Sequence, residues 1–428
     1  MNASRRVYSV VVALAVPLAS LVVFWRGWRE RTYWQGWPER FGLGEPMPGR
    51  GRSIWLHAVS VGEVQAASTL VAELRTRWPE LPVVISCGTP AGRERARALG
   101  SDGLHVRYAP YDLASCVRGA LRRLRPALLV IMETELWPNL LAVCEEAGVQ
   151  VLVASARLSA RSARRFSWFP NLLRPALQGN VTAATQSTED QQRFEGLGMS
   201  PERTPVCGNL KFDRTPSAAL RAEGAQLRAR YAPGRFMWVA GSTHAGEEQA
   251  VLAAHETLRR AGMQALLVLA PRHRPRFETV AALLSSTGMH WARRSASQPD
   301  DGRPLEVLLL DTLGELEAFY AAADLAFVGG SLVPIGGHSL LEPTALGVPT
   351  IAGPHQENAP EVARQLLAAG ALQIVTQDAA LARVVLELAR DEAARRQLSQ
   401  AALSAVAANR GALECILTLI KARLAPPA

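Results

Sequence analysis

The sequence has few cysteines, and those it has form no pattern. Five occur in 428 residues, none of them in a C-x-x-C pair, and they are Cys87, Cys116, Cys144, Cys207 and Cys415. Scattered cysteines in an odd number argue against a disulfide framework and against a cysteine-rich metal site. We therefore expect reduced thiols in a cytosolic compartment.

The sequence also lacks the common phosphate-binding and nucleic-acid-binding motifs. Neither a G-x-G-x-x-G fingerprint nor a Walker G-x-x-x-x-G-K-[ST] motif occurs, which argues against a dinucleotide or ATPase site. Zinc-finger spacing, a basic low-complexity tail and an RNA-binding aromatic motif are absent as well. The formal net charge is nevertheless +9, with a pI of about 9.8. Such an excess suits anionic partners, so we expect a membrane surface or phosphorylated substrates and no nucleic acid.

Charged residues are absent from one stretch near the N-terminus, residues 7–25. A run of this length is just long enough to cross a hydrocarbon core of about 30 Å. A secretory signal peptide is the alternative, but tryptophans and arginines follow where a small-residue cleavage site is expected. Aromatic rings mixed with arginines over 25–41 are typical of a membrane interface, and the arginine excess places the body in the cytoplasm. We expect residues 1–40 to form a membrane anchor that spans the bilayer or, given Pro17, lies in it.

From residue 53 onward, short apolar runs alternate with helical stretches. This alternation predicts parallel sheets with helices on both faces. A polar, helical segment, 212–232, separates two series of runs. We therefore predict an α/β protein with two doubly wound, Rossmann-like domains, 50–215 and 233–428, that face a cleft, with ligands at the carboxyl ends of the strands. The expected strands are 53–59, 81–87, 127–132, 149–155 and 181–187, then 236–242, 265–271, 306–311, 325–331 and 348–354.

Two carboxylate motifs follow strands of the first half. "HAVSVGEVQAA" at 57–67 places Glu63 where a helix begins, in a turn of the kind that usually holds phosphate. "METELWPNL" places Glu133 and Glu135 at a strand end, where a period of two turns both side chains the same way. The pair suits a divalent metal or hydrogen bonds to a polyhydroxyl substrate. Because no histidine or third carboxylate lies nearby, the second interpretation is favoured.

Basic residues dominate the end of the first half. "SARLSARSARRFSWFP" at 155–170 supplies Arg157 and Arg161, followed by Trp168 and Phe169. A helix with a basic face and aromatic rings suits an anionic lipid surface, although an ordinary amphipathic surface helix explains the pattern equally well. "GNLKFD" then contributes Lys211.

The second half carries a glycine-rich stretch, "GGSLVPIGGHSLLEP" at 329–343. Its glycines would let backbone amides approach a phosphate at the N-terminus of a following helix, with Glu342 accepting from a ribose hydroxyl. A structural alternative is equally specific, because Ser339 and Glu342 match a capping box.

Three further motifs in this half follow strands. "LAPRHRPRF" offers Arg272 to a phosphate, or forms a solvated basic loop. In "DTLGELEAFYAAAD", Glu315 either caps a helix or contacts a ligand. In "GSTHAGEE" at 241–248, a serine and a threonine precede two glutamates, the arrangement of a capped helix with acidic residues in its first turn.

Together these motifs resemble the 3-deoxy-D-manno-octulosonic acid (Kdo) transferase family of lipopolysaccharide biosynthesis. The similar segments run in order from about residue 55 to 357, behind the predicted anchor. They are "HAVSVGE", "GTPAGRERA", "YAPYDL", "METELWPNL", "ARLSARS", "GNLKFD", "STHAGEE", "APRHRPRF", "DTLGEL" and "AFVGGSLVPIGGHSLLEP". The resemblance implies an inverting, metal-independent glycosyltransferase of the GT-B fold. It would move Kdo from CMP-Kdo to the lipid A precursor at the cytoplasmic face of the inner membrane, and would need no cofactor.

The resemblance also implies roles for individual residues. Glu63 is similar to the general base, and Glu133 and Lys211 are similar to residues that stabilise the transition state. Glu135, Arg157 and Arg161 are candidates for acceptor binding. The CMP-binding segments correspond to Pro271, Arg272, Leu313, Gly314, Glu315, Ser339, Leu340, Leu341 and Glu342.

The sequence departs from the family pattern at two positions. Ser339 stands where the family form Asn-Pro-Leu-Glu begins with asparagine, so a side-chain contact there is in doubt while backbone contacts should survive. Ser155 likewise stands where Asn-Ala-Arg-Leu-Ser is expected. Two rival functions are a nucleotide-sugar isomerase on the same fold, which would need no anchor, and a tethered binding protein, which would leave the glutamates without a purpose.

Overall fold

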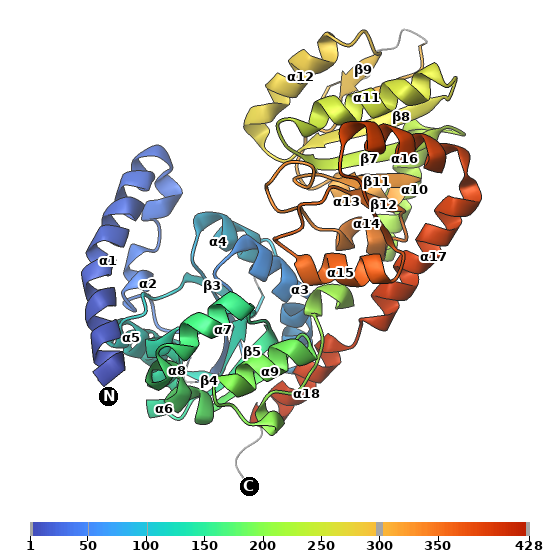
Figure 1. Ribbon diagram of the computed structural model, residues 1–428. Helices are drawn as coiled ribbons and strands as arrows, with labels where there is room; N and C mark the ends of the chain where they lie inside the picture. Colours follow the sequence, from blue (N-terminus) through green and yellow to red (C-terminus); the bar gives the residue numbers. More distant parts are fainter. Residues whose placement is uncertain (1–2, 50, 101, 297–302, 425–428) are drawn as a thin grey trace. The chain divides into compact units, whose positions relative to one another are not determined.

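The computed structural model describes residues 3–49, 51–100, 102–296 and 303–424, which fold as two compact units (Figure 1). Unit 1 consists of Met1–Asp213 together with Asn409–Ala428, and unit 2 consists of Arg214–Ala408. Each unit contains its own parallel sheet with helices packed against it.

The sheet of unit 1 has six parallel strands in the order β3-β2-β1-β4-β5-β6. The chain starts in the middle of the sheet, at β1, and the strand order reverses between β1 and β4. In sheets of this kind, ligands bind outside the carboxyl ends of the strands at that switch point. The strands are β1 Ser53–His57, β2 Val83–Cys87, β3 Leu104–Tyr108, β4 Pro126–Met132, β5 Gln150–Ala156 and β6 Val181–Thr185.

Helices cover both faces of this sheet with apolar side chains. Trp55 of β1 faces one core cluster, whereas Ile54 and Leu56 face the other, as expected for alternate residues of a strand. The elements of unit 1 outside the sheet are α1 Ala3–Arg29, η1 Arg31–Trp34, α2 Trp37–Arg40, α3 Val61–Arg77, α4 Pro90–Arg97, α5 Ala114–Leu124, α6 Pro138–Glu146, α7 Ala160–Ser167, α8 Pro170–Gln178, α9 Thr188–Gly196, η2 Pro201–Arg203, η3 Leu210–Asp213 and α18 Ala412–Leu424.

The sheet of unit 2 has seven parallel strands in the order β13-β12-β11-β7-β8-β10-β9, with the switch point between β7 and β11. The strands are β7 Phe236–Thr243, β8 Ala265–Pro271, β9 Trp291–Arg293, β10 Val307–Leu309, β11 Leu325–Val328, β12 Thr350–Ala352 and β13 Leu372–Ile374. The helices are α10 Ala218–Tyr231, α11 Glu247–Arg260, η4 Arg274–Arg276, α12 Phe277–Ser285, α13 Leu316–Ala322, α14 Leu341–Ala345, α15 Pro360–Ala368, α16 Asp378–Arg390 and α17 Glu392–Ala408.

The predicted fold class, two doubly wound parallel sheets, is confirmed. All ten expected strands are present, although several are shorter than expected. Three strands were not expected, β3, β9 and β13, and each of them forms an edge of its sheet. Edge strands are open to solvent on one side, so they need no continuous apolar run, and β3 indeed reads Leu-His-Val-Arg-Tyr.

The predicted limits of the C-terminal domain, 233–428, are wrong at both ends. Helix α10 belongs to unit 2, because Leu227 and Tyr231 pack in the same core cluster as α13. Helix α18 returns to unit 1, because Ile416 and Leu417 pack with β1 and β4. Asp213 strengthens that return, since its carboxylate accepts hydrogen bonds from the backbone N–H groups of residues 411 and 413 at 2.7 and 3.0 Å.

The expectation that every cysteine is a free thiol is also wrong. Cys207, which precedes η3, and Cys415 of α18 form a disulfide between positions 208 residues apart in the sequence. The other three cysteines are buried thiols. No local spacing could reveal the pair, because it depends on the return of α18 to unit 1.

Two stretches of the described residues are long and apolar enough to cross a membrane by length and composition, Ala3–Trp28 and Glu392–Leu424. The second combines α17 with α18, whose apolar residues lie in the core of unit 1. The first is α1, and only 6% of its most apolar window is buried. The predicted N-terminal apolar helix is therefore present, and most of its surface is uncovered.

Candidate active site

Glu63 lies at the first turn of α3, directly after the carboxyl end of β1. Ser60 is the N-cap residue of α3, and its hydroxyl accepts from the backbone N–H of Glu63 at 3.2 Å. The Glu63 carboxylate turns back, accepting from the N–H of Val59 at 2.7 Å and from the hydroxyl of Ser60 at 3.1 Å. This reciprocal arrangement resembles a capping box, and it fixes the carboxylate at the switch point of the sheet.

The environment of Glu63 raises the pKa of its carboxyl to near neutral pH. Its exposed fraction is 9%, and the pKa of the carboxyl is raised from 4.5 to about 7, mainly by burial. The negative charges of Glu135 and Glu133 also raise this pKa, whereas the hydrogen bonds from Val59 and Ser60 lower it. Burial therefore outweighs the hydrogen bonds that the carboxylate accepts. A carboxylate with this pKa is well matched to accept a proton at neutral pH.

Glu133 forms an ion pair with Lys211 beside this carboxylate. The Glu133 carboxylate and the Lys211 ammonium are 2.7 Å apart, with side chains 15% and 32% exposed. Glu133 directly follows β4 and has a positive φ of 54°, a conformation that L-residues rarely adopt. Its backbone N–H donates to the carbonyl of Ala154, and its carbonyl accepts from the N–H of Arg157. Such strain at a strand end is typical of functional sites, where the surroundings hold it in place.

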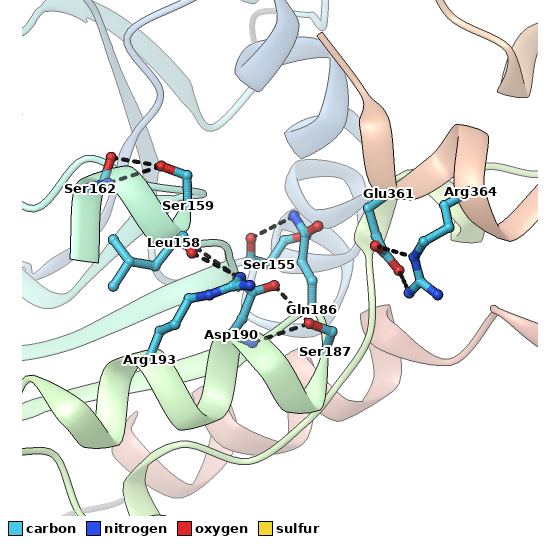
Figure 2. A network of polar contacts seen from close by, with 10 residues as sticks. All are labelled: Ser155, Leu158, Ser159, Ser162, Gln186, Ser187, Asp190, Arg193, Glu361 and Arg364. Carbon is cyan, nitrogen blue, oxygen red and sulfur yellow. Dashed lines mark hydrogen bonds and ion pairs between the residues drawn. The ribbon is translucent and has the colours of Figure 1, made fainter. Parts of the chain in front are cut away.

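Ser155 positions the turn that carries Lys211. Its hydroxyl accepts from the backbone N–H of Leu210 at 3.2 Å and from the Gln186 side-chain amide at 3.2 Å. Figure 2 shows Gln186 reaching Ser155 in this way, beside a separate network in which Asp190 binds the backbone of Leu158. Ser155 is 2% exposed and has a positive φ of 53°. Gln186 was not predicted from the sequence, in which only its position directly after β6 points to the site.

Glu135 lies in the turn between β4 and α6 rather than in a strand. The prediction that the side chains of Glu133 and Glu135 point the same way from a strand is therefore wrong. The left-handed conformation of Glu133 ends the strand and with it the alternation of side-chain directions. The negative charges of the two carboxylates nevertheless both raise the pKa of Glu63. The indole N–H of Trp137 donates to Glu135 at 2.6 Å and holds it in place.

The two arginine candidates have different surroundings. Arg157 follows β5, and its backbone N–H binds the carbonyl of Glu133 at 3.3 Å. Arg161 lies on α7 with an exposed side chain. The structure therefore brings together Glu63, Glu133, Glu135 and Lys211, with Arg157 next to them along the backbone.

We expect Glu135→Gln to lower the pKa of Glu63. Removing a nearby negative charge favours the ionised form of Glu63, so the acid limb of the pH profile of kcat/KM should move to lower pH. The measurement is kcat/KM between pH 5 and 9, with Glu145→Gln on α6 as the matched control. An acid limb at the same pH in Glu135→Gln and wild type would contradict the coupling.

The nucleotide-binding candidates of unit 2 lie in loops after β8, β10 and β11. Pro271 ends β8, and exposed Arg272 follows, with its backbone N–H bound to the carbonyl of Thr243 at 3.0 Å. Leu313 is 57% exposed beside Gly314, whose φ is 88°. Glu315 forms an ion pair with Arg294 at 2.6 Å and accepts from the hydroxyl of Thr312.

The predicted capping box at Ser339 is absent. Helix α14 begins at Leu341, and its N-cap residue is Leu340, which has helical backbone angles and no side-chain cap. Ser339 is exposed and precedes this turn, so its hydroxyl is not in the capping position. Leu340 is 1% exposed, and Leu341 and Glu342 are partly buried.

Glu247 organises the glycine-rich loop after β11. Its carboxylate is fully buried and accepts four backbone hydrogen bonds, from His244, Gly330, Ser331 and Leu332, at 2.7–2.9 Å. The amides at 330–332 therefore bind this carboxylate, and the expectation that the whole glycine stretch offers its amides to a phosphate is wrong for these three. The prediction that Ser242 and Thr243 cap α11 is wrong too, because the N-cap residue is Gly246 with a φ of 98°.

Three histidines gather at the carboxyl ends of β7, β8 and β11, a cluster that sequence reasoning missed. His244 and His338 stack with 5.1 Å between ring centroids, and their Nε2 atoms are 2.9 Å apart. His273 packs edge-on against His244 at 5.3 Å. Burial, followed by the charge of Arg272, lowers the pKa of His338 to about 4. The sequence shows His244 and His273 just after β7 and β8, but His338 lies well into the loop after β11, so no local pattern joins the three.

No group of three or more histidine, cysteine, aspartate or glutamate residues suited to hold a metal ion occurs among the residues that the structure describes. The chemistry open to unit 1 is proton transfer by Glu63 beside an ion pair. The chemistry open to unit 2 is binding of an anion by the exposed guanidinium of Arg272.

Comparisons with known proteins bear on both units. Residues 35–214 match the family described as 3-deoxy-D-manno-octulosonic-acid transferase (kdotransferase), and residues 305–404 match glycosyl transferases group 1. The 3-deoxy-D-manno-octulosonic acid transferase of Haemophilus influenzae is 35% identical over 97% of this chain and 98% of its own length. The Bordetella pertussis protein of the same name is 38% identical over 95% of this chain and 96% of its own.

A solved structure extends the likeness to the fold. UDP-GlcNAc 2-epimerase from Neisseria meningitidis, bound to UDP-GlcNAc, is 14% identical, with a TM-score of 0.59, over 87% of this chain and all of that one. A likeness at this identity concerns the fold alone. Together with the glycosyl transferase match, it identifies the two-sheet architecture as the GT-B fold.

Proposed function

The chain belongs to the 3-deoxy-D-manno-octulosonic acid (Kdo) transferase family, and on that premise we propose that it moves Kdo from CMP-Kdo to lipid IVA. Lipid IVA is the tetraacyldisaccharide precursor of lipid A, and CMP is the second product. The observation that carries the proposal is Glu63, a buried carboxyl with a pKa of about 7 beside the Glu133–Lys211 ion pair.

The proposed reaction is a single displacement that inverts the anomeric centre. A hydroxyl of the acceptor attacks the anomeric carbon of Kdo while Glu63 takes its proton, and the bond from that carbon to the CMP phosphate oxygen breaks. Positive charge develops at the anomeric carbon, as in other glycosyl displacements. The negative charge of Glu133 would stabilise that positive charge, and the positive charge of Lys211, its ion-pair partner, would stabilise the departing phosphate.

Unit 2 is the proposed donor-binding unit. The exposed Arg272 guanidinium suits the CMP phosphate, and the loops at 313–315 and 339–342 would contact the rest of CMP. Because Ser339 is exposed and does not cap α14, its hydroxyl is available to a ligand, but it lacks the amide donors of the family asparagine. The proposal includes no metal and no cofactor.

The proposed acceptor is a lipid, and features of unit 1 support work at a membrane. Helix α1 leaves most of its apolar surface uncovered. Trp168 and Phe169, between α7 and α8, are 69% and 58% exposed, next to the exposed Arg161, Arg164 and Arg165. Aromatic and basic side chains in this combination suit an anionic lipid surface. We place the protein at the cytoplasmic face of the bacterial inner membrane.

The direct test is incubation of the purified protein with CMP-Kdo and lipid IVA. We expect release of CMP and a lipid heavier by one or more Kdo residues, measured by mass spectrometry, with activity unchanged by EDTA. Incubation with CMP-Kdo alone is the control for hydrolysis. Absence of a glycosylated lipid under conditions where the Haemophilus influenzae relative makes one would refute the proposal and favour the isomerase or binding alternatives.

A further inference from the structure

One face of α1 is bound to the rest of unit 1 along much of its length. Near the N-terminal end, Arg5 forms an ion pair with Glu146 at 2.7 Å, and its Nε donates to the side-chain oxygen of Asn139 at 3.1 Å. The Ser9 hydroxyl donates to the same oxygen at 3.1 Å, and the hydroxyl of Tyr8 donates to Asp112 at 2.8 Å. Further along the helix, the Ser20 hydroxyl donates to the hydroxyl of Tyr111 at 3.3 Å.

These contacts follow the helical repeat. Positions 5, 9, 16, 20 and 27 are buried or hydrogen-bonded and recur every four or seven residues, so they share one face of the helix, and Tyr8 lies at its edge, three residues after Arg5. From Arg5 to Ser20 the bound face extends about 22 Å along the axis at 1.5 Å per residue. That length is most of the hydrocarbon thickness of about 30 Å.

The opposite face of α1 is apolar and uncovered. Its exposed large hydrophobic side chains are Val7, Val10, Val11, Leu14, Leu18, Leu21, Val22, Phe24, Trp25 and Trp28, each at least 50% exposed. A continuous apolar face of this kind requires a partner. Its length, with tryptophans and exposed Arg26 at the C-terminal end, suits a lipid bilayer with anionic headgroups.

The charged groups that α1 contacts belong to the body of unit 1. Glu146 is 44% exposed and also pairs with Arg118, which is 52% exposed. Asp112 accepts from the backbone N–H groups of Asn139 and Leu140 at the start of α6. If α1 crossed the bilayer while bound in this way, these charged groups would lie in hydrocarbon, at a cost of about 3 kcal/mol for each charge. Crossing would therefore require α1 to leave unit 1 and lose the whole set of contacts.

We infer that α1 lies along the membrane surface without crossing it, with its polar face on unit 1 and its apolar face in the lipid of one leaflet. The Arg5 end of the helix is then on the same side of the membrane as the body. Helix α8 packs against α1, so the basic and aromatic turn between α7 and α8 belongs to the same side of unit 1. The inference rests on the proposed function only for the statement that this side is cytoplasmic.

Thiol labelling tests the inference in membranes. Ala3→Cys places a thiol at the exposed start of α1, and Ala379→Cys places one on the exposed surface of unit 2. With a membrane-impermeant maleimide, we expect both to be labelled only after spheroplasts are permeabilised. Labelling of Ala3→Cys in intact spheroplasts would overturn the inference, because the helix would then cross the bilayer. Labelling of Ala379→Cys in intact spheroplasts would instead overturn the proposed location of the body.

Disulfide cross-linking tests the contact between α1 and unit 1 directly. We expect Ser9→Cys with Asn139→Cys to cross-link in oxidised membranes, because the native side-chain oxygens are 3.1 Å apart. Val10→Cys with Asn139→Cys is the matched control, since Val10 lies on the uncovered face and both pairs share the Asn139 change. Mass spectrometry of unreduced peptides measures the products. Equal cross-linking of the two pairs, or none in either, would overturn the inference.

Discussion

Glu63→Gln is expected to lower the transfer rate by at least about a hundredfold while CMP binding persists. Glutamine keeps the shape of the side chain and an oxygen for the N–H of Val59, but it cannot accept the acceptor proton. The CMP-binding candidates are in unit 2, away in the sequence from α3. The measurement is kcat for Kdo transfer together with calorimetry of CMP binding.

The pH dependence of the wild-type rate follows from the same group. A general base must be ionised, so kcat/KM should rise with pH through about 7, the pKa of Glu63. Glu63→Gln should lack this limb. Glu73→Gln is the matched control, because Glu73 lies on the exposed side of the same helix and pairs with Arg77. Near-wild-type turnover in Glu63→Gln would remove Glu63 from the mechanism.

The raised pKa of Glu63 also predicts how the free energy of unfolding changes with pH. Its pKa is higher in the folded state than the ordinary 4.5, so the folded protein binds more protons between the two values. This contribution is therefore fully present below about pH 4.5, and it is lost as the pH rises through about 7. Urea unfolding should show a smaller loss of stability over this range in Glu63→Gln than in wild type.

Glu247→Gln is expected to lower the free energy of unfolding of unit 2 by about 3 kcal/mol or more. The carboxylate accepts four backbone hydrogen bonds that join the start of α11 to the loop after β11. Glutamine would place an N–H₂ donor against two of those N–H groups and leave them unsatisfied. Each buried donor without a partner costs about 1–3 kcal/mol.

The measurement for Glu247→Gln is chemical unfolding followed by amide hydrogen exchange at 330–332. Exchange of these amides should accelerate more than exchange in β8, because the four N–H groups that bind this carboxylate all lie outside β8. Glu278→Gln is the matched control, since Glu278 is 79% exposed in a surface pair with Arg293, and it should have little effect. Equal stability of the two variants would show that the Glu247 carboxylate is not the support of the loop.

The residues of the candidate site differ in how far the sequence could predict them. Glu63, Glu133 and Lys211 each follow a predicted strand or close the first half, and parallel strands bring their carboxyl ends to one edge. Their proximity is therefore a consequence of the fold class. Ser155 and Gln186 also follow strands, but their role depends on a hydrogen bond to the turn of Lys211, and no local pattern encodes it.

The predictions from local sequence patterns were wrong at Ser339 and in the glycine-rich stretch. Ser339 and Glu342 match a capping box, yet the chain becomes helical only at Leu341. The glycine-rich stretch resembles a phosphate loop, yet Glu247, more than 80 residues earlier in the sequence, binds three of its amides. A loop motif indicates which ligands the backbone N–H groups of a segment could bind in isolation. In the folded chain, the buried carboxylate of Glu247 binds three of those N–H groups instead.

By itself, the sequence determined the α/β class, the central strands of both sheets, the apolar N-terminal helix and the family resemblance, because these depend on hydrophobic periodicity and on contiguous motifs. Only the tertiary structure decided the return of α18, the Cys207–Cys415 pair, the histidine cluster and the packing of α1 on unit 1. It also decided the pKa of Glu63, in which burial outweighs the hydrogen bonds from Val59 and Ser60. Burial and long-range pairing belong to the folded chain as a whole, so no local stretch of residues carries them.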